Sequence, residues 1–281
     1  MSFSIEKTQQ SLASEGWCII EDVVPRNVLY TIHQASLTLV KEQRIKIESW
    51  HTEQSQRGWQ GRITGVEKAE GVVEAIPQFA PYVANRRIMD VVEANFGPHV
   101  RVSSTSVIVT NPYNQRGYWH ADWPFNQTIA SHIPAPYSNS VIHISTIFMI
   151  TDFSADNGGT LIVPRSHQLP KNPSGDNDID CKSSHPNEIN VTGTAGSVFL
   201  YDSRLWHSVA PNYSKQPRVA ISVRYAPWWL NLDVRRKGSP DYVRIVNKTN
   251  GKDNSVPLLS KASFDALPEN TKPLFSHWVE R

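Results

Sequence analysis

The spacing of apolar residues changes near residue 100, and this change most restricts the folds open to the chain. Before it, apolar residues recur at helical spacing over Ile5–Glu15, in a helix that begins at Pro25, and over Tyr82–Asn95. Trp17–Ile20 is a brief apolar run with strand character. After it come short runs rich in Val, Ile, Thr and Phe: Val100–Thr110, Val141–Ile150, Thr160–Val163, Ser197–Tyr201 and Val219–Tyr225. Strands that follow one another without intervening helices predict an antiparallel sheet pair or barrel.

The predicted organisation is one domain over residues 1–281. It has a mostly helical flank at 1–99, a β core at 100–230 and a C-terminal extension at 231–281. No low-complexity linker separates the helical part from the strands, so the helices are expected to pack on the outside of the sheets. A polar segment at 170–190 is expected to form a loop that resembles a lid. A length of 281 residues is near the upper limit of what one core usually organises.

The composition sets several classes of protein aside. Lys and Arg number 28 against 26 Asp and Glu, a formal charge of +2, which argues against nucleic acid or membrane surfaces as partners. The two cysteines are far apart and suggest neither a zinc knuckle nor a disulfide framework. Residues 1–12 show no apolar leader, and no run reaches the length of a membrane span. A cytoplasmic protein is therefore expected. The sequence does not indicate its oligomeric state.

A pair of metal-binding side chains stands out among the ten histidines. In the run Tyr118-Trp119-His120-Ala121-Asp122, residues two apart point to the same face of a strand, so His120 and Asp122 would project together. His207 lies shortly after the expected strand Ser197–Tyr201. That strand could bring His207 beside them as a third ligand. Two histidines and one carboxylate leave coordination positions open and suit Fe(II) and dioxygen. Zinc hydrolases also use three protein ligands, so the residues alone leave the metal open.

Arg218 is the third feature that bears on function. It lies eleven residues beyond His207 and opens the strand that runs to Tyr225. We expect a hairpin to return it beside the ligand strand, where its guanidinium could bind a carboxylate through two parallel hydrogen bonds. A surface salt bridge is the other interpretation of an arginine at such a place.

With these residues in view, the chain resembles the phytanoyl-CoA dioxygenase-like branch of the Fe(II)/2-oxoglutarate-dependent oxygenases. The resemblance extends over nearly the whole chain and rests on the order and spacing of five blocks: Trp119–Asp122, Thr151–Thr160, Val163–His167, Phe199–His207 and Pro211–Arg218.

The resemblance implies a mainly β fold, a double-stranded β-helix (jelly roll) with N-terminal helices packed outside. It implies that His120, Asp122 and His207 bind iron, that Arg218 holds the distal carboxylate of 2-oxoglutarate, and that Thr160 also contacts this co-substrate. The implied activity is a dioxygenase that consumes O2 and 2-oxoglutarate, releases succinate and CO2, and hydroxylates a small organic substrate. Since Asp122 is kept, halogenation is not expected.

Several residues are given structural roles. Arg165 stands where relatives usually have Gly, which predicts either a backbone penalty or a reshaped turn. His167 is expected to close that turn, and His132, His143 and His185 are expected in loops or packing. By strand parity Tyr118 faces inward with the ligands. The indole rings that point the other way are expected to pack helices against the sheets: Trp119, Trp123 and Trp206.

Two other functions remain open at this point. One is a jelly-roll protein that binds metal or 2-oxoglutarate without catalysis, and the other is a cupin-type metalloenzyme that does not use 2-oxoglutarate. Arg218 is the residue that separates them from the dioxygenase. The substrate is expected to be a small molecule, and an anionic one is favoured because three arginines lie in sequence near the expected mouth of the site: Arg116, Arg165 and Arg204.

Overall fold

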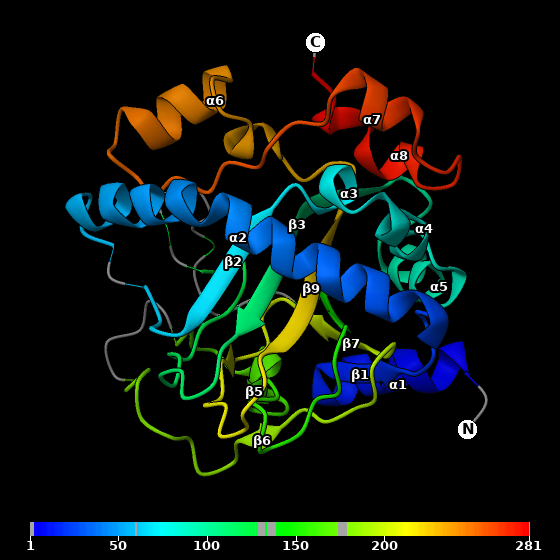
Figure 1. Ribbon diagram of the computed structural model, residues 1–281, viewed down its shortest axis with the longest axis vertical. Helices are drawn as coiled ribbons and strands as arrows, with labels where there is room; N and C mark the ends of the chain where they lie inside the picture. The colour runs from blue at the N-terminus through cyan, green and yellow to red at the C-terminus, as the bar shows by residue number, and fades with distance from the viewer. Residues whose placement is uncertain are drawn as a thin grey trace.

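Two antiparallel sheets form the core of the chain (Figure 1). The computed structural model describes residues 3–59, 61–126, 128, 133, 139–173 and 179–280. The major sheet has six strands in the order β1-β7-β4-β9-β3-β2, and the minor sheet has three in the order β6-β5-β8. The strands are β1 Trp17–Ile20, β2 Val66–Glu70, β3 Val100–Thr110, β4 Ile144–Met149, β5 Leu161–Ile162, β6 Ile189–Asn190, β7 Val198–Asp202, β8 His207–Ser208 and β9 Arg218–Pro227.

Helices flank this core at both ends of the chain. Together with the two facing sheets they confirm the predicted mainly β fold with a jelly-roll core and outer helices. The helices are α1 Ile5–Glu15, α2 Arg26–Gln56, α3 Val72–Ala75, α4 Ala80–Val83, α5 Arg86–Phe96, α6 Pro240–Tyr242, α7 Lys261–Asp265 and α8 Lys272–Phe275.

The helix expected over Tyr82–Asn95 is in fact two helices. α4 ends at Val83, and α5 begins at Arg86 after Asn85, whose extended backbone interrupts the helix. The Asn85 side chain accepts a hydrogen bond from the backbone N–H of Arg87, an N-cap that starts α5 anew. The apolar periodicity continues across the break, so the spacing alone does not reveal it.

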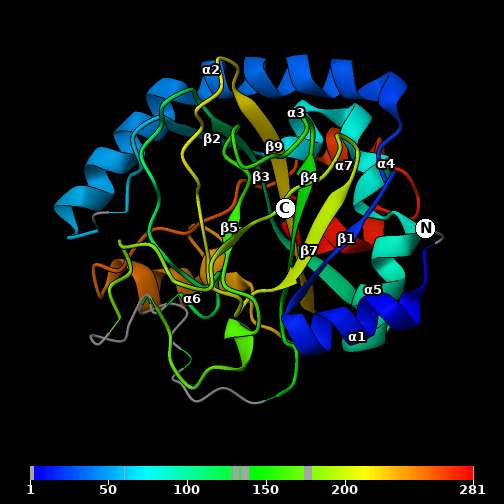
Figure 2. The same ribbon diagram turned by 90° about the horizontal axis from the view of Figure 1, so that it is seen from below.

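The long helix α2 covers the outer face of the major sheet. Figure 1 shows it crossing β2, β3 and β9, and Figure 2 shows the minor sheet on the opposite side of the major sheet. Its side chains Leu29, Ile32 and Leu39 belong to one apolar cluster with Val107 of β3 and Ile221 of β9. Burial of this face, at about 25 cal/mol for each Å² of apolar surface, is what holds the helix on the sheet.

The other face of the major sheet looks toward the minor sheet and carries polar residues among apolar ones. Residues of β9 that share this inner face are two apart and are Arg218, Ala220, Ser222 and Arg224. Ile147 of β4, which the register places on the same face, packs with Ile162 of the minor sheet. The polar half of this interior is where a functional site can form.

Strand β2 was not anticipated by the sequence. It pairs with β3, with Lys68 opposite Ile108 and Glu70 opposite Ser106. Directly opposed residues share one face of a sheet, so Lys68 and Glu70 lie on the inner face. A strand usually carries apolar residues on its inner face. Because this one carries charged residues there, the sequence pattern does not predict a strand.

The segment after β9 contacts both strand β3 and the C-terminal end of α2. The indole Nε1 of Trp278 donates to the carbonyl of Val102 at 2.6 Å, which fixes the C-terminal turn against β3. Farther back, the backbone N–H of Asp253 donates to Oε1 of Gln54 at 2.7 Å, so this loop is bound to the end of α2. Among the helices of the described ranges, none is both long and apolar enough to cross a membrane.

Gly196 gives a direct test of the contact between the major sheet and the start of α2. Its carbonyl accepts the N–H groups of Val23 and Val24, its φ is 93°, and an added Cβ would lie 2.4 Å from the carbonyl oxygen of Val24. Gly196→Ala should therefore lower the free energy of unfolding by about 3 kcal/mol or more.

The matched control is Gly238→Ala, where φ is 83° but no atom lies within 4 Å of the added Cβ. It should lose only the backbone part, about 1–2 kcal/mol. Urea unfolding of both variants measures the difference, and equal losses would show that the contact with Val24 is not a close one.

Candidate metal centre

The segment before Asp122 and strand β8 meet at a single pair of residues. The N–H of His120 donates to the carbonyl of His207 at 3.1 Å, and the N–H of His207 donates back at 3.0 Å. This pairing is an isolated β-bridge. Of the strand expected at 118–122, only His120 therefore pairs with a neighbouring strand. The reciprocal bonds nevertheless place the two imidazole rings side by side, with centroids 4.2 Å apart.

Each imidazole is oriented by its own backbone. Nδ1 of His120 lies 3.0 Å from the carbonyl oxygen of Tyr118, and Nδ1 of His207 lies 2.9 Å from that of Leu205. A carbonyl only accepts, so each Nδ1 carries the proton and each Nε2 keeps its lone pair. Ligand atoms of His120, Asp122 and His207 all lie within 4.8 Å of one another, which is a spacing that one metal ion can bridge.

Asp122 is held by three donors that leave it ionised. Its Oδ2 accepts the hydroxyls of Ser145 and Tyr201, each at 2.8 Å, and its Oδ1 accepts Nη2 of Arg224 at 2.6 Å. Burial would raise the pKa of Asp122, but Arg224 and the neighbouring imidazoles oppose it, and the net pKa lies well below the ordinary value. A carboxylate that stays charged when buried is a competent metal ligand.

The two histidines are biased toward the neutral form that a metal needs. Burial, followed by the nearby His207, lowers the pKa of His120 to about 3. Burial also lowers the pKa of His207. Both rings therefore remain deprotonated at Nε2 through the neutral range, as metal ligands must be.

Arg218 opens β9, but no hairpin returns it beside the ligand strand. β8 lies in the minor sheet and β9 in the major one, so the prediction of adjacent strands was wrong. Instead Arg218 shares the inner face of β9 with Arg224, which contacts Asp122. The two residues between them on that face are small, Ala220 and Ser222, and Ala220 packs in the apolar cluster that contains Ile147 and Met149.

The Arg218 guanidinium is buried without a carboxylate. It is 3% exposed, its Nε donates to the carbonyl of Gly158 at 3.1 Å, and it lies 4.5 Å from the centre of the Phe153 ring. Within the described ranges it forms no ion pair, and burial lowers its pKa to about 10. A buried cation without an anionic partner is costly, and an anionic ligand would offset that cost.

The other residues singled out from the sequence fall around this centre. Thr160 is buried directly before β5, and its carbonyl accepts the N–H of Val191. Arg165 does adopt the left-handed backbone that favours Gly, with φ 67°, and its side chain pairs with Glu15. His167 was expected to close that turn, but its Nε2 lies 3.1 Å from the carbonyl oxygen of Ala13 in α1, so its contact joins the turn to that helix.

The three arginines that suggested an anionic substrate are all engaged elsewhere. Arg116 pairs with Glu188 at 2.6 Å, Arg165 with Glu15 at 2.8 Å, and Arg204 with Asp202 at 2.6 Å. Their position near the expected mouth therefore does not indicate the charge of the substrate.

The tryptophans only partly match their predicted roles. Trp119 and Trp206 point away from the ligands, but they pack under the 179–185 loop rather than under helices. Trp123 joins the apolar cluster that contains α2 and lies under the guanidinium of Arg235. Of the expected lid, residues 174–178 lie outside the described part, as does His132.

His143 was assigned to packing, but it belongs to a buried chain of hydrogen bonds that reaches the metal centre. Its Nδ1 lies 2.6 Å from the Ser203 hydroxyl and its Nε2 lies 2.8 Å from that of Ser103. Ser145 donates to Asp122, so it accepts from Ser203, which in turn accepts from Nδ1–H of His143. The chain from His143 to Asp122 therefore runs in one direction, and in the neutral ring Nε2 accepts from the Ser103 hydroxyl. Sequence spacing gave no sign of it, because Ser103 and Ser203 come from segments distant from His143 and Ser145.

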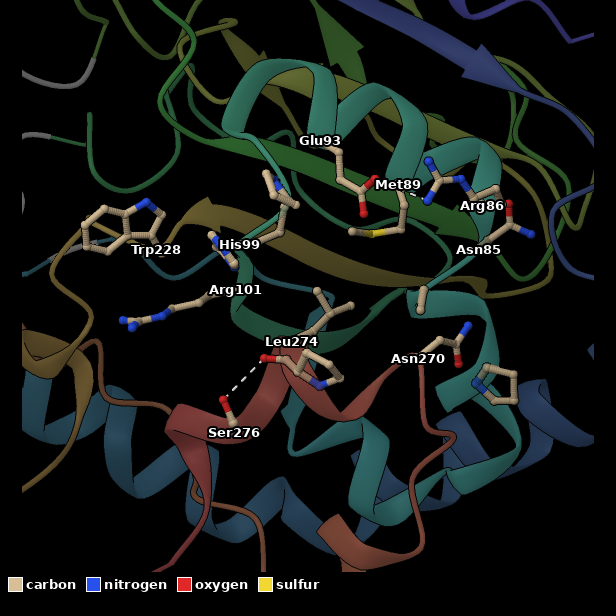
Figure 3. Close-up of a pocket in the computed structure, with 15 residues that line it drawn as sticks. Asn85, Arg86, Met89, Glu93, His99, Arg101, Trp228, Asn270, Leu274 and Ser276 are labelled. Carbon is tan, nitrogen blue, oxygen red and sulfur yellow. Dashed lines mark hydrogen bonds and ion pairs between the residues drawn. The ribbon is translucent and has the colours of Figure 1, made fainter.

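A large surface hollow lies apart from these residues. Figure 3 shows it between α5, the start of β3 and α8, with Arg86, Glu93, His99 and Trp228 among the labelled side chains. Its volume is about 880 Å³, and none of the predicted site residues lines it. Arg86 there is already paired with Asp90 and Glu93.

Comparison with known proteins then decides the family. The profile of phytanoyl-CoA dioxygenase (PhyH) matches residues 12–220, which include every ligand candidate and Arg218. The chain belongs to the phytanoyl-CoA dioxygenase family. The predicted resemblance is confirmed.

Within and near this family, the similar proteins are distant in sequence. Uncharacterized protein Rv1501 of Mycobacterium tuberculosis is 24% identical over 257 residues, covering 86% of this chain and 81% of that one. The epimerase SnoN in complex with Fe3+, alpha ketoglutarate and nogalamycin RO has a TM-score of 0.56 at 16% identity, covering 79% of this chain and 83% of that one. HygX from Streptomyces hygroscopicus with nickel, 2-oxoglutarate and hygromycin B bound has a TM-score of 0.58 at 14% identity, covering 83% and 93%. At such identities these structures show the shared phytanoyl-CoA dioxygenase fold.

His143 makes the stability of this family member sensitive to acid. Burial and then Arg224 lower the pKa of His143 from the ordinary 6.5 to about 3. The unfolded chain therefore takes up a proton on this residue below pH 6.5 while the folded chain does not. His143 alone should reduce the free energy of unfolding by about 1.4 kcal/mol for each pH unit between 6.5 and 3.

Thermal unfolding of the metal-free protein from pH 7.5 to 4.5 measures this slope. His143→Gln should be less stable at neutral pH, since it disturbs the hydrogen-bond chain, yet lose less stability on acidification. Parallel pH curves for the two proteins would contradict a neutral His143.

Proposed function

We propose that the chain is a non-haem Fe(II)/2-oxoglutarate-dependent dioxygenase that hydroxylates a small organic substrate and releases succinate and CO2. The observation that carries the proposal is the combination of His120, Asp122 and His207 at one point with the unpaired, buried Arg218 on the facing sheet. The triad provides a metal site with open positions, and the arginine provides a partner for a dicarboxylate.

The donor set fits Fe(II). His120 and His207 offer neutral Nε2 atoms, and Asp122 offers one anionic oxygen, the set that non-haem Fe(II) oxygenases use. Arg224, Ser145 and Tyr201 hold the carboxylate in place, so that its orientation does not depend on the metal. Fe(II) with 2-oxoglutarate and O2 would supply the oxidising power for the reaction.

What the chain itself contributes is binding, orientation and exclusion of water. Arg218 would hold the distal carboxylate of 2-oxoglutarate, with Phe153 shielding the guanidinium from water. Thr160 precedes β5, whose Ile162 pairs with His207, so it lies on the same sheet as a ligand and is proposed to contact the co-substrate.

The structural relatives support this assignment of cofactors. SnoN is described with iron and alpha ketoglutarate, and HygX with nickel and 2-oxoglutarate. Other described relatives include a carbocyclase, SnoK, so the fold accommodates more than one outcome of the same cofactors. Hydroxylation is proposed here as the outcome that requires no further residue.

Asp122→Ala tests the metal assignment. Removing the carboxylate should abolish Fe(II) binding and reduce succinate formation from 2-oxoglutarate by more than about 100-fold, since three ligands fall to two. Calorimetric metal titration and a succinate assay provide the measurements. Asp265→Ala, at an exposed ion pair on α7, is the control and should match wild type. Near-normal turnover in Asp122→Ala would remove the triad from the mechanism.

Arg218→Ala tests the co-substrate. Loss of a buried bidentate partner should raise KM for 2-oxoglutarate about 10- to 100-fold while Fe(II) affinity stays unchanged. Arg165→Ala, which breaks an exposed pair, should leave KM as in wild type. If Arg218→Ala kept its affinity for 2-oxoglutarate, a cupin-type metalloenzyme or a protein that only binds metal would be the better account.

A further inference from the structure

The interior of the two-sheet core is open to solvent on one side. On β4 and β7 the inner-face residues are buried, whereas on β2 and β3 all of them except the buried Thr110 are partly or fully exposed. The exposed or partly exposed inner-face residues of this side are Val66, Lys68, Glu70, Ser104, Ser106 and Ile108. A substrate that reaches the metal centre is expected to pass these side chains.

An aromatic wall leads from the metal ligands to this region. The Tyr118 ring lies 5.3 Å from that of His120, centre to centre. A Cβ added to Gly61 would lie 2.6 Å from the Tyr118 hydroxyl and 2.3 Å from the Trp59 ring, so Gly61 is in close contact with both. Tyr118, Gly61 and Trp59 therefore form a continuous surface that begins at a predicted ligand.

Lys252 stands at the far end of this wall. Its Nζ lies 3.9 Å from the centre of a Trp59 ring and 5.8 Å from that of Trp50. The loop that carries it is bound to α2, because Trp50 donates to the carbonyl of Asp253 and Asp253 donates to Gln54. The ammonium is thus positioned by the fold rather than free on a surface chain.

Lys68 lies on the inner face of the major sheet, and its charge acts on Lys252. It lies opposite Ile108, which lies opposite Ala220, so Lys68 is in the inner-face row between those of Arg218 and Arg224. Its side chain is accessible, yet the surrounding protein and then Arg224 lower its pKa. The register therefore places Lys68 on the inner face of β2, with its side chain exposed to solvent.

The two ammoniums disfavour each other. Burial, and then the charges of Lys68, Arg224 and Arg235, lower the pKa of Lys252 to about 7. In the part of the chain that the structure describes, neither lysine forms an ion pair with a carboxylate. Glu70 lies two residues away on the same face of β2, and burial raises its pKa, which weakens its value as a counter-ion. Asp122 and Glu70 favour the charged form of Lys68, and the Trp59 ring faces the Lys252 ammonium, so the compensation of these charges is partial.

We propose that Lys68 and Lys252 bind an anionic group of the substrate and so direct its remaining part along the wall of Trp59 and Tyr118 toward the metal centre. The inference rests on the proposed function and adds to it the substrate class, a small molecule with a carboxylate or a phosphate. A bound anion offsets the repulsion between the lysines, whereas a neutral molecule leaves it in place.

Calorimetric titration of the anaerobic Fe(II)·2-oxoglutarate complex of the full chain tests the inference. The probes are benzoate, phenyl phosphate and neutral benzamide, three molecules with the same ring. Wild type should bind at least one anion about ten-fold more tightly than benzamide, and the better anion distinguishes carboxylate from phosphate recognition.

Four variants assign this preference to the two lysines. Lys68→Met and Lys252→Met should each weaken the anion about ten-fold and leave benzamide unchanged. Lys252→Arg keeps the charge and should retain binding. Lys41→Met, on the exposed face of α2, is the matched control. Anions that bind wild type no better than benzamide, or methionine variants that bind them as wild type does, would overturn the inference.

The visible charge-transfer band of Fe(II) with 2-oxoglutarate distinguishes a failure of the proposed function from a failure of the substrate inference. If the band fails to form in wild type, the proposed function fails, and the same titrations on the metal-free chain still decide whether the lysines select anions. If the band forms but no anion is preferred, only the inference about the substrate fails. In each variant the band also reports that the core has folded.

Discussion

The single backbone bridge between His120 and His207 is the contact on which the metal centre depends. It joins a segment without regular strand structure to the two-residue strand β8, and it does so with two hydrogen bonds of 3.1 and 3.0 Å. Because each imidazole is also bound to a carbonyl two residues earlier, the ring orientation follows from the backbone. The protein's own hydrogen bonds therefore orient the rings, which lowers the reorganisation that metal binding would require.

Asp122 completes this centre. Burying its carboxylate costs free energy, and donors on the major sheet offset that cost. A buried carboxylate is expensive, and here β4, β7 and β9 each supply one donor to it. The same carboxylate ends the hydrogen-bond chain that begins at Ser103 and passes through His143. The two sheets are consequently held together at the metal centre by polar contacts and elsewhere by the apolar cluster around Ile147, Phe199 and Ile162.

The sequence predicted which residues come together better than it predicted their setting. The spacing of His120 and Asp122 is common by itself, and His207 together with the resemblance to the family singled out the three residues that the structure brings within 4.8 Å. β3 was predicted with its bounds. β2 escaped because its inner face carries Lys68 and Glu70, which reverses the apolar alternation that marks a strand. Arg224 could have been found, since it lies an even number of residues from Arg218 on one strand, but its contact with Asp122 depends on sheet register. Lys252 could not, because nothing local relates it to Trp59.

The formal charge of +2 hides the distribution that matters for recognition. Arg116, Arg165 and Arg204, which are prominent in sequence, are each neutralised by a carboxylate. Arg218, Lys68 and Lys252 have no such partner in the described ranges, and all three lie on or beside the interior of the two-sheet core. Cations that the fold leaves unpaired discriminate strongly, because a ligand without the matching charge leaves them desolvated and mutually repelled. Selectivity at this centre would then arise from the cations that have no carboxylate partner in the protein. Arg218 would select the co-substrate, and the two lysines would select the substrate.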